Sequence, residues 1–276
     1  MLRLRQLFLL LVLLSTAFGC ASPGVMRAAY QGDAPELQRL IKNGADINLV
    51  DKGWTPLLVT LGRGALDASR LLIESGASVT AATPDGKTSM FIAAHGGYVE
   101  ICRLLLEKGA DVNTAARNGD TPLIAASVMQ RTEAVRFLLE HGARIDSAND
   151  QGRTAIMEAS FYGNTEVVKL LAGKGAFVNG KDRNGGTCLT FASLRDQKPT
   201  IRALIAAGAE VNLPDNEGRT PLMLAAAKGF PGTVELLLES GANINATSRL
   251  GETPMSMAKK EGQSAVVEQL TTWANK

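Results

Sequence analysis

The sequence repeats itself with a period of 33 residues, and this periodicity limits the possible folds more than any other feature. A threonine-led motif starts at Thr55, Thr88, Thr121, Thr154, Thr187, Thr220 and Thr253. A Gly-Ala pair recurs at nearly the same spacing, at Gly44, Gly76, Gly109, Gly142, Gly175, Gly208 and Gly241. Self-similarity at a fixed period is the signature of stacked supersecondary units that share one continuous core.

Each unit has the pattern of two short antiparallel helices. Threonine followed by proline, as at Thr121-Pro122, is a typical helix start. The threonine hydroxyl accepts a hydrogen bond from an N–H of the first turn, and proline has no N–H that would need a partner there. A glycine such as Gly163 then supplies a turn with positive φ. In the second helix, aliphatic residues at helical spacing, such as Val135 and Leu138, face the first helix and the next unit.

The pattern resembles the ankyrin repeat. The clearest copy runs over residues 118–148, with G-D-T-P-L-I-A-A near its start and V-R-F-L-L-E-H-G-A near its end. The resemblance covers residues 26–274 and implies an all-α ankyrin-repeat solenoid of about eight units. The first and last units are incomplete, as expected for repeats that cap a shared core.

Two units depart from the pattern at the turn between their helices. Gln130 and Asp196 stand where the inter-helix glycine is expected, and a left-handed residue with a Cβ costs on the order of 1 kcal/mol. We therefore expect these turns to be reshaped. In the sixth unit Cys188 also replaces the helix-starting proline, so this unit should be the least regular.

Residues 1–19 have the layout of a signal peptide. An unbroken apolar run from Leu7 to Leu14 follows two arginines, and it is shorter than the roughly 20 residues that a membrane-spanning helix needs. The ending A-F-G-C resembles the lipobox of bacterial lipoproteins. That resemblance implies lipidation of Cys20, a lipidated tether over residues 20–25 and, since no aspartate follows the cysteine, the outer membrane. The alternatives are a plain secretory signal, which gives a soluble periplasmic or secreted protein, or an uncleaved anchor.

The charges of the chain are balanced. Lysine and arginine number 29 against 27 acidic residues, and the predicted signal peptide contains Arg3 and Arg5, so its removal leaves 27 of each sign. Around the expected hairpin tips, basic and acidic residues alternate. The chain therefore lacks the basic stripe that nucleic-acid binding requires.

The sequence contains no catalytic, cofactor-binding or metal-binding set. Its only histidines, His95 and His141, are expected at surface or turn positions, and no H-E-x-x-H, G-x-S-x-G or Walker-type motif occurs. Cys102 and Cys188 are interpreted as small core residues. We therefore expect no enzymatic activity, no cofactor, no metal and no small-molecule substrate.

Ankyrin proteins bind other proteins on a concave surface built from hairpin tips and first helices. The positions to examine are the residue before each threonine and the two residues before the inter-helix glycine. The candidate partner-binding residues at these positions are Trp54, His95, Asp120, Val128, Met129, Arg153, Phe161, Tyr162, Leu194, Arg195 and Arg219. The apolar members concentrate in units four to six. We expect a binding hot spot there, with Arg153, Arg195 and Arg219 at its rim.

These patterns predict an exported, membrane-anchored and non-catalytic module that binds a periplasmic or envelope protein. Its only contact with the bilayer would be the N-terminal lipid. Two alternatives remain open at this point. The apolar residues of units four to six can pack on one another and bind nothing, and the array can serve as a structural or self-associating envelope scaffold without a specific client.

Overall fold

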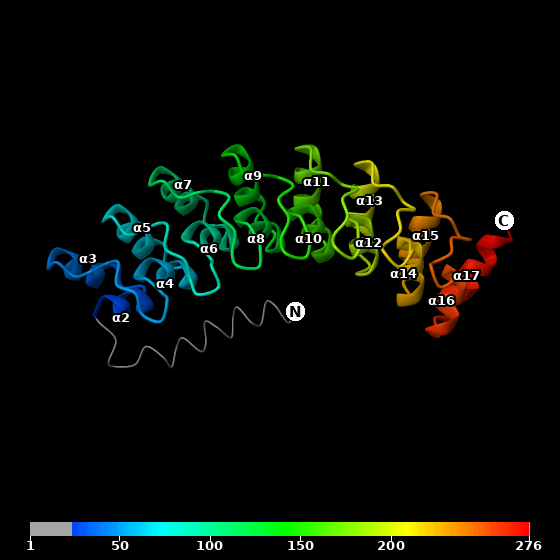
Figure 1. Cartoon of the computed structure of the whole chain (residues 1–276), viewed down its shortest axis with the longest axis horizontal. Coiled ribbons are helices and arrows are strands. Elements are labelled where there is room, and N and C mark those ends of the chain that lie inside the picture. The colour runs from blue at the N-terminus through cyan, green and yellow to red at the C-terminus, as the bar shows by residue number, and fades with distance from the viewer. Residues whose placement is uncertain (1–23, 276) are drawn as a thin grey trace. The chain divides into compact units, whose positions relative to one another are not determined.

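The structure is a computed structural model that describes residues 24–275. These residues form 16 α-helices, and within them the extended segments make only isolated bridges, such as the one between Asp51 and Trp54. The predicted all-α repeat solenoid is confirmed. The chain divides into two compact units of several repeats each, at the boundary between Ala143 and Arg144, and each unit is described separately below. Figure 1 labels the helices of both units in chain order.

The first unit contains four helix pairs: α2 (Gly24–Gln31) with α3 (Ala34–Lys42), α4 (Pro56–Arg63) with α5 (Leu66–Glu74), α6 (Ser89–Gly96) with α7 (Val99–Glu107), and α8 (Pro122–Val128) with α9 (Thr132–Glu140). The first helices of the pairs pack on one another in chain order, and the second helices form another layer. The core lies between the layers and includes the fully buried Leu58, Leu72 and Leu105.

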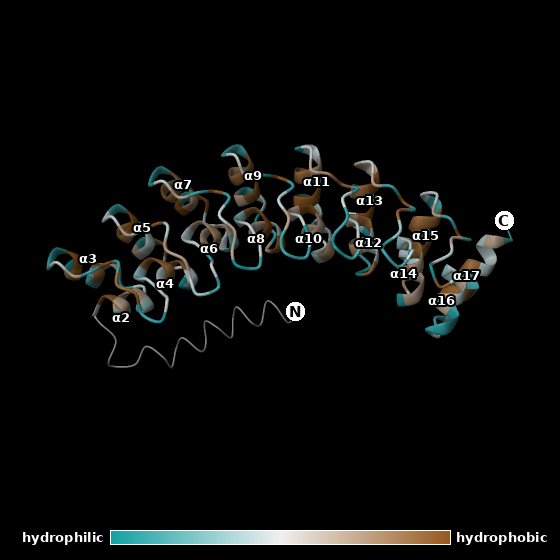
Figure 2. Cartoon of the chain, in the orientation of Figure 1, coloured by the Kyte–Doolittle hydropathy of each residue, from teal (hydrophilic) through white to brown (hydrophobic). Residues whose placement is uncertain are grey.

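The second unit also contains four pairs: α10 (Ala155–Tyr162) with α11 (Thr165–Gly173), α12 (Cys188–Ser193) with α13 (Lys198–Ala206), α14 (Pro221–Lys228) with α15 (Pro231–Glu239), and α16 (Pro254–Lys260) with α17 (Ser264–Ala274). Its layers follow the same scheme, and Ile156, Leu171 and Leu237 are fully buried between them. In both units the hydrophobic residues follow the helices, whereas the loops between pairs are largely hydrophilic (Figure 2). Each unit therefore buries the apolar stripes of its helices against neighbouring repeats.

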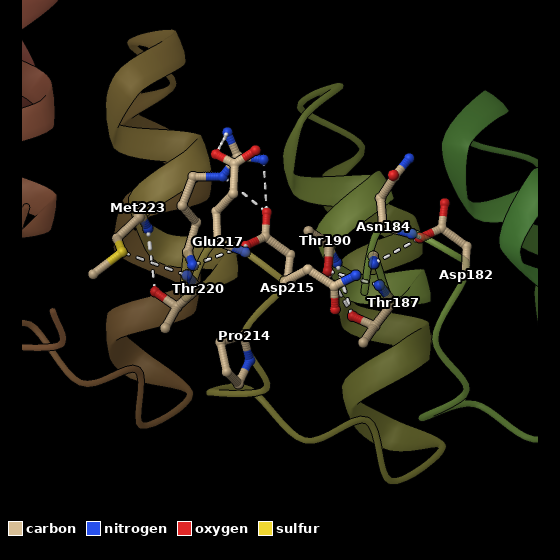
Figure 3. A network of polar contacts seen from close by, with 12 residues as sticks. Asp182, Asn184, Thr187, Thr190, Pro214, Asp215, Glu217, Thr220 and Met223 are labelled. Atoms are coloured by element: carbon tan, nitrogen blue, oxygen red, sulfur yellow. Dashed lines mark hydrogen bonds and ion pairs between the residues drawn. The ribbon is translucent and has the colours of Figure 1, made fainter. Parts of the chain in front are cut away.

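The repeated threonines start the first helices as predicted. Six of the seven accept a hydrogen bond from the N–H three residues later. At Thr187 the bond is reciprocated, because the Thr190 hydroxyl also accepts the Thr187 N–H at 2.9 Å (Figure 3). Thr154 is the exception and makes no side-chain cap. The helix starts are thus fixed by the local chemistry of single residues.

The Gly-Ala glycines end the second helices because of their backbone conformation. Gly175 has φ +89°, and a Cβ added there would meet no atom within 4 Å. The next residue, Ala176, donates its N–H to the carbonyl of Leu171 at 3.0 Å, which closes the last turn of α11. The glycine is required by its left-handed conformation and not by lack of space.

A ladder of asparagine side chains joins successive repeats. Asn179 Nδ2 donates to the Gly208 carbonyl at 3.1 Å, and its Oδ1 accepts the Glu210 N–H at 2.9 Å. Asn212 makes the same two bonds to the repeat that follows it. Asp146 takes this place in the fourth repeat and accepts the Phe177 N–H at 3.0 Å, but a carboxylate has no N–H group to donate to the next repeat. These bonds fix the spacing between neighbouring Gly-Ala turns.

The two turns without glycine keep the left-handed conformation. Gln130 has φ +56° and Asp196 has φ +54°, values close to those of the glycines at equivalent positions. The predicted reshaping of these turns is therefore wrong. The first helices of the two repeats are short, since α8 ends at Val128 and α12 already at Ser193, but α16, whose turn keeps Gly262, is as short as α8. The sixth repeat therefore has the shortest helix of the described chain, in agreement with its predicted irregularity.

The helical array begins earlier than predicted. Gly24 and Val25 were assigned to the tether over residues 20–25, but they form the start of α2. This part of the assignment is wrong because Val25 is 4% exposed and belongs to the core. Residues 1–23, with the predicted signal peptide and Cys20, lie outside the described residues.

Candidate protein-binding surface

In each unit the hairpin tips and the first helices form one surface, which we call the inner face. In the second unit this face carries three aromatic rings close together. Phe161 and Tyr162 end α10, and Phe191 lies in the middle of α12. The Phe161 ring meets the Tyr162 ring edge-on at a centroid distance of 5.1 Å and the Phe191 ring at 6.2 Å. The rings thus connect the fifth and sixth repeats, and Phe161 and Tyr162 remain partly exposed.

Two guanidinium groups lie against these rings. Arg195 Cζ is 4.3 Å from the centroid of Phe161, and Arg153 Cζ is 4.5 Å from that of Phe191 and 5.7 Å from that of Phe161. The four side chains alternate in the order Arg195, Phe161, Arg153 and Phe191. We call these four residues the aromatic–arginine cluster. Cation–π contacts of this kind hold both arginines and rings in fixed orientations.

Arg153 is also neutralised by two buried carboxylates. Its Nε lies 3.2 Å from Asp182 Oδ2, and its Nη1 lies 3.6 Å from Glu158 Oε1. The side chains of Asp182 and Glu158 are only 1% and 5% exposed. Asp182 Oδ1 also accepts the N–H groups of Asn184 and Gly186, the first of which is drawn in Figure 3. Arg153 was predicted at the rim of the hot spot, but it is an internal link between two repeats.

Gly186 makes room for the Phe191 ring. It occupies the position before the threonine, where most repeats carry a larger side chain. A Cβ at Gly186 would lie 2.9 Å from Phe191 Cζ and 3.3 Å from Asp182 Oδ1. The missing side chain therefore lets the ring approach the tip, where Arg153 covers it.

Comparison with known families decides the classification of the chain. A family model described as ankyrin repeats (3 copies) matches residues 25–116, 111–182 and 177–248. The chain belongs to the ankyrin repeat family. No curated protein matches the sequence. Ankyrin repeats indicate a protein–protein interaction module, and proteins of this family are generally non-catalytic.

Two further candidates belong to the same ankyrin unit as the cluster. Arg219 is held by carboxylates, since Nη2 lies 2.7 Å from Asp215 Oδ2 and Nη1 lies 2.8 Å from Glu217 Oε2. Leu194 follows α12 directly and is partly exposed beside Arg195. Of the three arginines predicted at the rim, Arg195 alone is exposed and has no carboxylate at ion-pair distance in the described chain.

The other five candidates lie on the first ankyrin unit. Trp54 exchanges two backbone hydrogen bonds with Asp51 at a tip, and the Asp120 carboxylate accepts a bond from Asn118 Nδ2 at 2.6 Å. The remaining three, His95, Val128 and Met129, lie at the ends of α6 and α8 and are partly exposed. The predicted hot spot is therefore divided between two units, and the aromatic–arginine cluster is confined to the second.

Burial shifts the pKa of one histidine of the inner face and of two cysteines of the core. Burial, aided by the charges of Lys87 and Arg131, lowers the pKa of His95 to about 4, so its ring is neutral at pH 7. Burial raises the pKa of the Cys102 and Cys188 thiols to about 12. Both cysteines are fully buried, as their interpretation as core residues requires. Residues 24–275 contain no group of three or more side chains placed to hold a metal ion.

Three residues of the site were missed from the sequence: Glu158, Asp182 and Phe191. One signal was available, because Glu158 and Phe191 share the position four residues after the repeated threonine. Other repeats place smaller apolar residues there, such as Val59, Ala125 and Leu224. A carboxylate followed one repeat later by a phenyl ring was unusual enough to mark this part of the inner face.

Proposed function

We propose that this ankyrin protein is an exported, lipid-anchored interaction module that binds another protein of the bacterial envelope through the inner face of its second unit. The observation that carries the proposal is the aromatic–arginine cluster. Its rings and its exposed guanidinium hold one another in place, and aromatic residues and arginine are enriched among the few residues that carry most of the binding energy of a protein interface. Preorganised side chains also lose little conformational freedom on binding.

Export and anchoring are proposed from residues 1–20 alone, where the signal-peptide pattern ends at Cys20. Within residues 24–275, none of the helices combines the length and the apolar character needed to cross a bilayer. A lipid on Cys20 would hold the array at the periplasmic side of a membrane, with the outer membrane favoured, and would raise its local concentration near an envelope partner.

Binding can be tested by capturing partners from envelope extracts with the intact chain. We expect Tyr162→Ala and Phe161→Ala to reduce recovery of a stoichiometric partner by at least about tenfold, as loss of a hot-spot residue does. Phe177→Ala is the matched control, because Phe177 is 64% exposed in the same unit but lies after α11, away from the cluster. Undiminished capture by both cluster variants, with their folding intact, would remove the proposal.

Anchoring can be tested separately. Metabolic labelling with a fatty-acid analogue should mark the native chain and Cys102→Ser, but not Cys20→Ser. The Cys20→Ser chain should also leave the membrane fraction. If it stays there and remains labelled, the lipid is not on Cys20.

The second candidate function is a self-associating scaffold. It is favoured by Leu250, an apolar side chain that is 81% exposed at the tip between α15 and α16. Sedimentation of the purified chain separates the two functions. A scaffold self-associates and loses that property with Leu250→Ser, whereas an interaction module stays monomeric until its partner is added.

A further inference from the structure

We propose that the inner face of the second unit recognises an extended acidic segment of its partner, and that Arg195 and Lys228 each bind one carboxylate of that segment. This inference rests on the proposed function and adds the chemistry of the partner to it. The two carboxylates would belong to residues three positions apart.

Arg195 is prepared to bind an anion. One face of its guanidinium lies over the Phe161 ring at 4.3 Å, which fixes the plane of the group but leaves its N–H edges available. The side chain is exposed, and no carboxylate of the described chain lies at ion-pair distance from it. A fixed guanidinium fork with unused donors matches a carboxylate in a bidentate geometry.

The neighbouring acidic groups are already engaged. Asp196 accepts the Thr233 hydroxyl at 2.6 Å, and Glu217 pairs with Arg219 at 2.8 Å. In the cluster itself, Asp182 and Glu158 neutralise Arg153. Arg195 therefore adds a positive charge to the inner face that the fold does not compensate with an ion pair.

Lys228 repeats this arrangement in the next repeat. It lies 33 residues after Arg195, at the equivalent position, and is the last residue of α14. Its side chain is exposed and forms no ion pair within the described residues. Because α12 and α14 pack against each other, the two cations are separated by about one helix spacing, roughly 8–10 Å.

That separation suits an extended chain with threefold periodicity. In a polyproline II conformation the rise is about 3.1 Å per residue with three residues per turn, so side chains three positions apart point the same way about 9 Å apart. Apolar side chains between the two acids would meet the partly exposed Leu194 and Ala227, and an apolar side chain beyond the acid bound to Arg195 would meet the partly exposed Tyr162. The face thus selects for both charge and spacing.

A simpler explanation must be tested against this one. Cations near the C-terminal ends of helices stabilise the helix dipole, and both Arg195 and Lys228 stand at such ends. That role predicts a loss of stability on substitution but no binding of acidic peptides. The experiment therefore measures binding and stability on the same variants.

The probe is the fluorescently labelled peptide PELPELP, in which the glutamates are three positions apart, and its binding to the intact chain is measured by anisotropy at low salt. Two comparators are PQLPQLP, which lacks the charges, and PELEPLP, which has the same composition with the glutamates two apart. We expect PELPELP to bind about tenfold more tightly than either comparator, and Arg195→Gln or Lys228→Gln to weaken it about 3- to 10-fold. Arg202→Gln on α13 is the control, since it removes an exposed charge of the same unit from the other layer.

The inference is overturned if PELPELP shows no binding at about 1 mM, if PQLPQLP binds equally well, or if the Arg195 and Lys228 variants bind as the native chain does. Equal binding of PELEPLP would indicate general attraction for anions and would also overturn it. Failure here is distinguishable from failure of the proposed function. A native partner whose capture depends on Tyr162 but not on Arg195 leaves the proposed function in place and removes only the acidic segment.

Discussion

Arg153 Nε lies 3.2 Å from Asp182 Oδ2, which joins the tips of two successive repeats across 29 positions of sequence. The carboxylate is almost completely buried, and the same guanidinium faces the buried Glu158. Arg153 therefore compensates the charges of two buried carboxylates.

Replacing Arg153 with alanine should destabilise the second unit by about 2 kcal/mol, because it leaves buried carboxylates without their cation. Arg153→Lys should lose less stability, because it keeps the positive charge beside the carboxylates. Some loss should remain, because lysine has no planar group to stack on Phe191. Chemical denaturation measures both losses. The control is Arg183→Ala, a nearby exposed arginine without an ion pair, which should change stability by less than about 0.5 kcal/mol. Equal effects of Arg153→Ala and Arg183→Ala would contradict the role given to the pair.

The asparagine ladder gives a second prediction. Asn179→Ala removes the donor to Gly208 O and the acceptor for Glu210 N–H, and should lower the free energy of unfolding by about 1–2 kcal/mol. Asn179→Asp keeps only the acceptor, so its loss of unfolding free energy should be roughly half that of Asn179→Ala. Asn184→Ala serves as control, because Asn184 is exposed and engages its neighbours through its backbone. If Asn179→Ala and Asn184→Ala have the same free energy of unfolding, the asparagine bonds do not stabilise the array.

The two left-handed residues without glycine should respond differently to Gly substitution. Gln130→Gly relieves a strained conformation at an exposed side chain, so we expect a gain of up to about 1 kcal/mol. Asp196→Gly relieves the same strain but deletes the acceptor of the Thr233 hydroxyl, a bond of 2.6 Å. Its gain should therefore be smaller or absent. Thermal unfolding of the two variants compares them directly, and a larger gain for Asp196→Gly would count against this interpretation.

The helix starts and turns of the repeats could be predicted from the sequence because they depend on local chemistry. Helix starts at Thr121 or Thr187 and the turn at Gly175 depend on the chemistry of one or two neighbouring residues, so the 33-residue pattern reveals them. The fold follows from these local signals because each repeat packs only on its neighbours.

The candidate site was less predictable because its contacts depend on side-chain direction. The position of Arg153 before its threonine indicated a surface residue, whereas its orientation toward Asp182 in the next tip makes it internal. Nothing in the spacing distinguishes it from Arg195, which turns outward over Phe161. Positions that are equivalent from one repeat to the next show which residues lie on the inner face. They do not show which of the charged residues there already form ion pairs within the fold.

Acidification should destabilise the fold through His95. Its pKa falls from the ordinary 6.5 to about 4 in the folded state, so below pH 6.5 the unfolded chain binds a proton that the folded chain does not. Above pH 6.5 the ring is neutral in both states, and His95 does not reduce the free energy of unfolding. As the pH falls from 6.5 toward 4, the free energy of unfolding decreases by about 1 kcal/mol per pH unit. His95→Gln should flatten that part of the stability profile. An unchanged slope in His95→Gln would show that other groups cause the acid sensitivity.

The two buried cysteines can report the opening of each unit separately. Cys102 lies in the first unit and Cys188 in the second, and burial raises the pKa of both thiols to about 12. Because only the thiolate reacts readily, neither should be modified by a disulfide reagent at pH 8 while its unit is folded. In a chain with Cys20→Ser, the labelling rate of each thiol should follow local unfolding and rise with denaturant. Arg153→Ala should then accelerate labelling of Cys188 more than that of Cys102. Equal acceleration at both thiols would mean that the two units open together, and rapid labelling of the native chain would contradict their burial.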